Sequence, residues 1–214
     1  NPLGGARTLD EMKRFVFPDI TAERRYRELE AKIAAFHDRG LAVIARPPRL
    51  GGVIFEAAWR LRGFEAFFID LITRPTMAAY LLDQMTFFNR INAGVLAGVG
   101  ADVIYLGDDI GEPTRMLISP DLWRLFVKPR MAQIVAAARS VNPAVHILYH
   151  SDGCFLPIIS DLVEIGVTAL NPVQPDCMDP LQVRALADGR LTLWGTMGAQ
   201  TTMLYASPEA VRQE

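Results

Sequence analysis

Residues 145–171, VHILYHSDGCFLPIISDLVEIGVTALN, contain one complete strand–helix–strand pattern. The apolar run 145–149 predicts a strand, the stretch 156–165 predicts a helix that ends at Gly166, and the run 167–170 predicts the next strand. Two strands that are joined by a helical crossover run parallel. This segment therefore predicts an α/β fold built on a parallel sheet.

The same alternation of strand and helix extends along most of the chain. Short apolar runs predict further strands at residues 41–45, 102–106 and 191–194, and the first of these is expected to be buried on both faces. The first helix is expected to begin at a Thr21 cap and to end before Gly40. Helices are predicted for residues 21–39, 53–62, 64–73, 76–98, 119–142 and 180–187.

Two architectures accommodate this alternation, a doubly wound sheet and a (β/α)8 barrel. No Gly-x-Gly-x-x-Gly turn follows a predicted strand, and polar residues collect at the C-terminal ends of several strands, where barrel enzymes carry their active sites. Both observations favour the barrel. A full barrel has eight strands and about 250 residues. We therefore expect residues 1–214 to form one barrel domain that is incomplete at both ends.

Composition and charge narrow the range of functions. Half of the 214 residues are hydrophobic, which excludes a disordered chain, and 22 basic against 24 acidic residues give a formal net charge of −2. This balance offers no electrostatic footprint for nucleic acid or for an anionic membrane, so a small-molecule partner is expected. No apolar run reaches the roughly 20 residues that a membrane-spanning helix needs. Two cysteines are too few for a disulfide framework, which indicates a reducing, cytoplasmic compartment.

Polar residues follow every predicted strand. In a parallel barrel these loops meet at one mouth, so Asp109, His150 and Gln174 are expected to line the same pocket. The general polarity of loops explains any single case, but explains all of them together less readily. The loops concerned are residues 46–49, 107–109, 150–154, 171–175 and 195–200.

Asp108 and Asp109 are adjacent carboxylates at the end of the second predicted strand. Adjacent residues that leave a strand point in opposite directions, so at most one of them is expected to face the mouth. Asp109 is then a candidate general base or cation ligand. The alternative is that one of the pair caps a turn at Gly111.

His146 and His150 lie four residues apart in a predicted strand and therefore share a face with Leu148. If that face is the barrel interior, His150 stands at the mouth, followed by Asp152 and Cys154. These positions suggest a metal site with His150 and Cys154 as ligands. The alternative is a packed histidine, because one histidine and cysteines at 154 and 177 match none of the strong zinc spacings. Ser151 lacks a Gly-x-Ser-x-Gly context, which argues against a serine hydrolase.

Five strings together resemble the uroporphyrinogen decarboxylase superfamily, and the resemblance runs over the whole chain. They are IFEAAWRLRG (54–63), GDDIG (107–111), LISPDLWR (117–124), YHSDG (149–153) and DLVEIGVTALNPVQP (161–175). The last, continued by Met178 and Asp179, is the most specific. The resemblance implies a (β/α)8 barrel. It also implies one of two activities, because this superfamily contains the tetrapyrrole decarboxylase of haem synthesis and methyltransferases that exchange methyl groups with a corrinoid cofactor.

The resemblance implies different residues for the two activities. The zinc methyltransferases of the family use His-x-Cys at a strand end and a later cysteine to bind a thiolate acceptor; His150 matches the histidine, and Asp152 stands in place of the cysteine. A carboxylate there lowers the preference for zinc. The decarboxylase has a tyrosine before a Glu-Gly pair where this chain has Trp59 to Gly63. Its catalytic aspartate and its arginine-bearing loop belong to a segment that is not present in these 214 residues.

Taken together, these features favour a methyltransferase that acts with a corrinoid cofactor or a corrinoid protein. The alternatives are uroporphyrinogen decarboxylation in porphyrin biosynthesis, which needs no cofactor or metal, and an inert ligand-binding barrel. Arg62 is expected either to bind an anionic group of the ligand or to pair with Glu65 on the surface. The candidate catalytic residues are Asp109, His150 and Asp152, and the candidate substrate-binding residues are Glu56, Trp59, Arg62, Asn171, Gln174 and Gln200.

Overall fold

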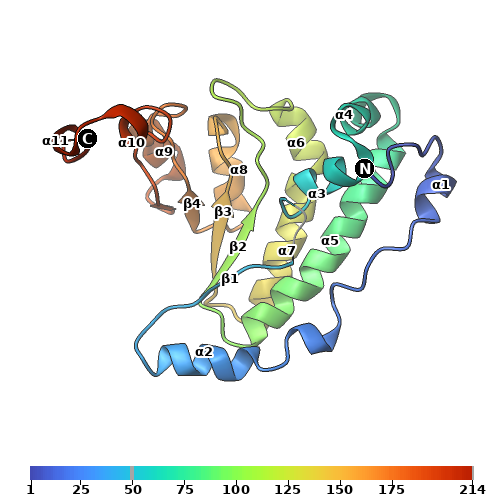
Figure 1. Cartoon of the computed structure of the whole chain (residues 1–214), viewed down its shortest axis with the longest axis horizontal. Helices are drawn as coiled ribbons and strands as arrows, with labels where there is room; N and C mark the ends of the chain where they lie inside the picture. The colour runs from blue at the N-terminus through green and yellow to red at the C-terminus, as the bar shows by residue number, and fades with distance from the viewer. Residues whose placement is uncertain (49–50, 214) are drawn as a thin grey trace.

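The sheet is parallel and its strands follow the order of the chain. The computed structural model describes residues 1–48 and 51–213 (Figure 1). A doubly wound sheet reverses its strand order at a switch point, whereas a sheet that keeps chain order is a run of consecutive βα units, as in a (β/α)8 barrel. The predicted partial barrel is confirmed. The strands are β1 (Ile44–Ala45), β2 (Val103–Gly107), β3 (His146–His150), β4 (Ala169–Asn171) and β5 (Thr192–Leu193), paired in that order.

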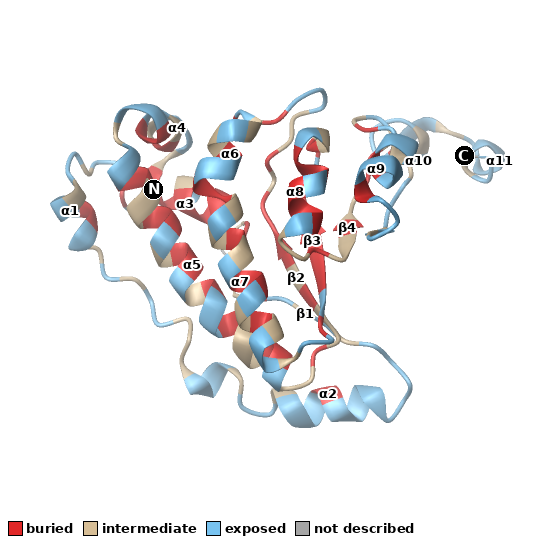
Figure 2. Cartoon of the chain, turned by 180° about the vertical axis from the view of Figure 1, so that it is seen from behind, coloured by how far each residue is buried: buried red, intermediate tan, exposed pale blue. Residues whose placement is uncertain are grey.

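Helices cover one face of this sheet and form the outer layer. Helix α5 packs along α7 and against β2, and both helices turn a buried stripe inward (Figure 2). No helix within the described residues is long and apolar enough to cross a membrane. The helices are α1 (Leu9–Lys13), α2 (Leu29–His37), α3 (Phe55–Arg62), α4 (Phe64–Thr73), α5 (Pro75–Gly98), α6 (Pro120–Phe126), α7 (Lys128–Val141), α8 (Ile159–Glu164), α9 (Pro180–Ala187), α10 (Thr202–Tyr205) and α11 (Pro208–Val211), with 3-10 turns at Glu23–Arg25 and Leu156–Ile158.

The two faces of the sheet differ in burial. On the helix-covered face, Ile104, Ile147 and Leu170 are completely buried. The other face carries His146 and Leu148 together, as the alternation predicted, and is an open groove among the described residues. The expectation that residues 41–45 form a strand buried on both faces is wrong. β1 is a two-residue edge strand, and Ile44 is 44% exposed because it lies on the open face.

Two predicted helices are broken at identifiable residues. The stretch 21–39 forms a 3-10 turn and then α2, because Glu28 adopts a left-handed φ of 72°. Thr21 does not cap a helix, since its N–H and its hydroxyl both donate to Asp19. The stretch 119–142 divides into α6 and α7 at Val127; Pro129, which lacks a backbone N–H, lies in the first turn of α7.

Candidate functional site

The carboxyl ends of β2 and β3 bring together Asp109, His150 and Asp152. One ligating atom of each residue lies within 4.8 Å of the others. His150 Nε2 is 3.5 Å from Asp109 Oδ1, and the same carboxylate oxygen accepts the Asp152 backbone N–H at 3.0 Å. The three residues predicted to be catalytic therefore form one cluster at the mouth of the partial barrel.

Two glycines let the loops after β2 and β3 approach closely enough to form this cluster. A Cβ on Gly111 would lie 2.5 Å from the carbonyl oxygen of Asp152, and a Cβ on Gly153 would lie 2.5 Å from Gly111. Gly153 also has a φ of 76°, which a residue with a side chain rarely adopts. The strings GDDIG and YHSDG thus carry glycine where the two backbones meet.

The imidazole of His150 is held from three sides. Its Nδ1 lies 2.9 Å from the side-chain oxygen of Asn171; because that oxygen can only accept, Nδ1 is the donor of this hydrogen bond, and Nε2 is the ring nitrogen that faces Asp109. Tyr105 stacks on the imidazole at 5.5 Å between ring centroids. Arg46 covers the Tyr105 ring at 3.8 Å. Arg49, at the end of the predicted polar loop 46–49, lies outside the described residues.

Gln174 performs a similar positioning role for Asp152. Its amide nitrogen donates to Asp152 Oδ1 at 3.3 Å, and its amide oxygen accepts the Gly153 N–H at 2.7 Å. The residue is only 7% exposed. Asn171 and Gln174, predicted to bind substrate, are thus next to the cluster, where they hold the side chains of His150 and Asp152 by hydrogen bonds.

Asp108 points away from the mouth, as the alternation predicted for one residue of the pair. Its carboxylate is completely buried and accepts the backbone N–H groups of Ile54 and Glu56 at 2.9 to 3.1 Å, which caps the start of α3 instead of a turn at Gly111. Burial raises the pKa of Asp108 to about 7, against the lowering effect of these backbone bonds. Nothing local in the sequence reveals this cap, because its partners lie more than fifty residues away.

Glu56 links α3 to the cluster. Its Oε2 accepts the Asp109 backbone N–H at 3.2 Å, and its Oε1 accepts from Arg60 at 3.3 Å. The Glu56 and Asp108 carboxylates both crowd Gly52, because a Cβ there would lie 2.1 Å from Asp108 Oδ1 and 2.8 Å from Glu56 Oε2. Glu56, predicted to bind substrate, is therefore part of the wall that supports Asp109.

Arg62 is not available to a ligand, which corrects both predictions made for it. It is 2% exposed, and its Nε donates to Asp70 Oδ2 at 2.7 Å. Its Nη1 donates to the carbonyl oxygens of Leu3 and Gly4 at 2.7 and 3.2 Å. Arg62 therefore fastens the N-terminal segment to α3 and α4, and its acidic partner is Asp70 instead of Glu65.

Three other predicted residues lie apart from the cluster formed by the described residues. Cys154, predicted to be a ligand with His150, lies outside the cluster; it lines a separate pocket beside the loop 112–120, because the turn at Gly153 redirects the chain. Trp59 packs edge-on against Phe64. The Gln200 backbone N–H donates to Asp176 at 3.1 Å, and the residue is exposed.

The cluster fits a divalent metal ion. One imidazole nitrogen and two carboxylate oxygens provide three protein ligands, the number found in catalytic sites that keep a position open for water or substrate. The ligands also have the orienting partners typical of such sites: Asn171 for His150, Gln174 for Asp152 and the Asp152 N–H for Asp109. A ligand set with two carboxylates accommodates zinc and harder ions alike. The predicted thiolate ligand, Cys154, would instead have favoured softer ions such as zinc.

Comparison with known proteins places this chain in one family. The family model "Uroporphyrinogen decarboxylase (URO-D)" matches residues 52–214. Methylcobamide:CoM methyltransferase MtaA of Methanosarcina barkeri is 27% identical over 122 residues, which are 57% of this chain and 34% of that protein. Uroporphyrinogen decarboxylase of Chlorobium limicola is 30% identical over 142 residues, 65% of this chain and 37% of that protein.

A solved methyltransferase from Methanosarcina mazei superposes with a TM-score of 0.69 at 22% identity, covering 87% of this chain and 52% of that chain. This chain therefore spans about half of the solved protein and little more than a third of the curated relatives. The structural match confirms the fold, and the two curated matches name two different activities.

Proposed function

This chain belongs to the uroporphyrinogen decarboxylase family, and we propose that it is the metal-binding part of a methyltransferase that exchanges a methyl group with a corrinoid protein. The observation that carries the proposal is the cluster of Asp109, His150 and Asp152 at the barrel mouth. Asp109, His150 and Asp152 would hold a divalent ion there, and its charge would lower the pKa of a small thiol acceptor so that the thiol loses its proton to water. The thiolate would then form the sulfur–methyl bond as the cobalt–methyl bond of the corrinoid breaks.

The residues of this chain would prepare the site for the ion and the acceptor. Asn171 keeps the proton on Nδ1 of His150, so that Nε2 is free to ligate. Gln174 holds the Asp152 carboxylate, and Glu56 holds the backbone of Asp109. Fixing the ligands before the ion arrives reduces the cost of ordering them on binding.

The charge at the mouth favours methyl transfer over the second activity in the family. Uroporphyrinogen carries several carboxylates, and Asp109 and Asp152 would repel them. Arg62, predicted to bind such an anion, is engaged inside the protein with Asp70. Decarboxylation stays the second candidate because the Chlorobium limicola relative carries that name.

Metal analysis and two activity assays on the purified full-length protein test the proposal. We expect about one divalent ion per chain and demethylation of methylcobalamin in the presence of 2-mercaptoethanol. His150→Ala and Asp109→Asn should lower metal occupancy and methyl transfer at least about 100-fold while the thermal melt is nearly unchanged. Asp121→Asn is the matched control, because Asp121 is 94% exposed and pairs only with Arg124 among the described residues.

The same experiments can also contradict the methyltransferase proposal. A protein that holds no metal, leaves methylcobalamin unchanged and releases carbon dioxide from uroporphyrinogen would contradict the methyltransferase proposal and support the decarboxylase. In that case His150→Ala should still reduce turnover, as a hydrogen-bonding or proton-transfer group.

A further inference from the structure

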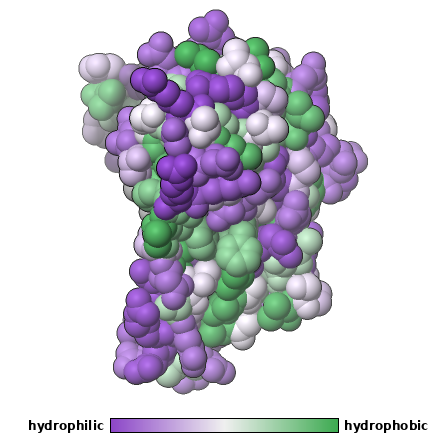
Figure 3. Space-filling view, turned by 90° about the vertical axis from the view of Figure 1, so that its right-hand side faces the viewer, coloured by the Kyte–Doolittle hydropathy of each residue, from purple (hydrophilic) through white to green (hydrophobic). Residues whose placement is uncertain are grey.

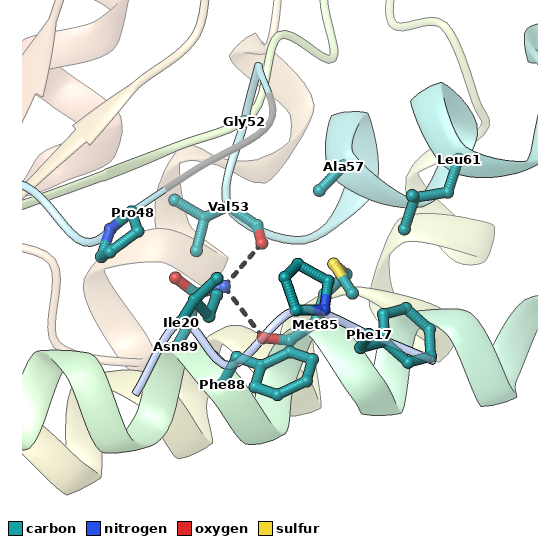
Figure 4. A pocket seen from close by; sticks show the side chains of 11 residues that line it. Phe17, Ile20, Pro48, Gly52, Val53, Ala57, Leu61, Met85, Phe88 and Asn89 are labelled. Atoms are coloured by element: carbon teal, nitrogen blue, oxygen red, sulfur yellow. Dashed lines mark hydrogen bonds between the residues drawn. The ribbon is translucent and has the colours of Figure 1, made fainter. Parts of the chain in front are cut away.

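An apolar cavity lies apart from the metal cluster, between the N-terminal segment, α3 and α5 (Figure 4). Its volume is about 270 Å³. On the side of the molecule that carries the N-terminal segment and α5, hydrophobic residues reach the surface between hydrophilic regions (Figure 3). The described residues that line the cavity include no charged side chain; among them are Phe17, Val53, Ala57, Leu61, Met85 and Phe88.

The polar side chain in this lining, Asn89, has no hydrogen-bonding group left for a ligand. Its amide nitrogen donates to the Val53 and Met85 carbonyl oxygens, both at 2.8 Å, which uses both amide hydrogens (Figure 4). Its amide oxygen is buried and presents almost no surface to the cavity. The described side chains around the cavity therefore offer neither a donor nor an acceptor, and they would not hold a water molecule, which needs several polar partners.

One wall of the cavity belongs to a strap, residues 15–20, that is held in place by apolar contacts. Within the part of the chain that the structure describes, the hydrogen bonds of the strap all stay within residues 12–26, so none joins it to α3 or α5. The Phe17 ring packs against the Phe88 ring of α5 at 5.8 Å between centroids. Because no hydrogen bond fixes the strap to α5, it can move aside to admit a ligand.

We propose that this cavity binds an uncharged, flat apolar molecule the size of two fused aromatic rings, held by van der Waals contacts. An apolar cavity of about 150 Å³ holds benzene, so the larger volume here suits a bicyclic ring. Protein interiors are packed as densely as organic crystals, and an unfilled apolar hollow lacks contacts that such a ligand would supply. The Phe17 and Phe88 rings give the wall aromatic surfaces for a flat ligand. Ionic ligands are disfavoured, because no described side chain in the lining would compensate their charge.

This binding proposal does not rest on the methyl-transfer proposal. The cavity is lined mainly by the N-terminal segment, α3 and α5, whereas the metal cluster belongs to the loops at the ends of β2 and β3. Ligand binding in the cavity can be measured without a metal ion and without a methyl donor. The failure of either proposal is therefore distinguishable from the failure of the other.

Isothermal titration of the full-length protein with benzothiophene and with indole tests the proposal. The two probes have nearly the same shape, but only indole has an N–H donor, which would lose its water and find no acceptor side chain in the lining. We expect benzothiophene to bind at least about tenfold more tightly, because burying an unpaired donor is unfavourable. Ala57→Leu should abolish binding of both probes by filling the cavity, whereas Ala136→Leu, at an exposed position of α7, should leave binding unchanged.

The strap provides a second test of the same site. Phe17→Ala removes an aromatic wall of the cavity and should weaken benzothiophene binding about tenfold. Val16→Ala is the matched control in the neighbouring residue. Because the Val16 side chain is 87% exposed, its truncation should leave the affinity unchanged.

Three results would overturn the proposal. Failure of benzothiophene to bind up to its solubility limit would show that the cavity takes no such ligand. Indole that binds as tightly as benzothiophene would show that contacts other than van der Waals contacts hold the ligand. Binding that survives both Ala57→Leu and Phe17→Ala would place the ligand elsewhere. Where Ala57→Leu does not fold, Leu61→Phe fills the same cavity from the next turn of α3 and gives the same test.

Discussion

His150 and Asn171 face each other as register partners of β3 and β4, and their side chains are joined by a hydrogen bond of 2.9 Å between Nδ1 and Oδ1. The sheet itself thus fixes which imidazole nitrogen is free. Because the two residues lie on neighbouring strands, the orientation of His150 depends on strand pairing and not on a mobile loop. Asn171 is therefore a positioning residue for the proposed metal ligand.

Asn171→Ala should weaken metal binding about 10- to 100-fold while the protein stays folded, because His150 loses the partner that fixes its ring. Competition with a chelator measures the affinity. Asn171→Asp supplies the same acceptor and should restore most of it, which a merely structural loss would not show. Unchanged affinity in Asn171→Ala would remove the positioning role.

Arg62→Met should destabilise the protein by about 3 kcal/mol, because it leaves the Asp70 carboxylate and two carbonyl oxygens buried with fewer donors. Arg74, which contacts the other Asp70 oxygen at 2.7 Å, compensates in part. Urea unfolding measures the change. Substrate affinity of the folded variant should stay unchanged; a large loss of affinity with unchanged stability would instead return Arg62 to a ligand-binding role.

The periodicity of the sequence was sufficient to predict the parallel sheet, the face shared by His146, Leu148 and His150, and the meeting of Asp109 with His150. These features follow from strand alternation and from the convergence of parallel strand ends. Cys154 could not be placed in the same way. The alternation that sets 150, 152 and 154 on one face ends with β3 at His150, and the left-handed φ of Gly153 then turns the chain.

Burial and distant partners were the features that the sequence did not reveal. The sequence predicts Arg62 as an exposed arginine on a helix. In the structure, α3 and α4 enclose Arg62 together with Asp70, which lies eight residues later in the chain. Asp108 reads as a loop carboxylate, yet it caps a helix from the preceding βα unit. Both depend on tertiary packing, which no local pattern records.

Stability should fall as the pH drops below about 4, in part because of Asp161. Burial raises the pKa of Asp161, but hydrogen bonds from Arg124 and Lys128 outweigh it and hold the pKa below its ordinary value of 3.8. A carboxylate with a lowered folded-state pKa stabilises the protein above its unfolded pKa and loses that contribution as the pH falls through the folded value.

Urea unfolding of Asp161→Asn at pH 6 and at pH 2.5 measures this contribution. The variant should be less stable than the wild type by about 1 kcal/mol at pH 6, and the difference should shrink at pH 2.5. Asp121→Asn, which changes an exposed partner of the same Arg124, should show a much smaller difference. If the difference in unfolding free energy between Asp161→Asn and the wild type is the same at both pH values, Asp161 does not contribute to the loss of stability in acid.

Gly52→Ala should destabilise the protein by about 1 to 3 kcal/mol, the range for overpacking at a closely packed position. The added Cβ would meet Asp108 Oδ1 at 2.1 Å and Glu56 Oε2 at 2.8 Å, and both carboxylates are buried. Moving Asp108 weakens the cap of α3, and moving Glu56 displaces the Asp109 backbone, so metal affinity should fall together with stability. Gly5→Ala is the matched control, because a Cβ there meets no atom within 4 Å. Thermal melts and chelator competition on both variants check the two effects, and Gly52→Ala with unchanged stability would show that the acidic pair does not depend on this glycine.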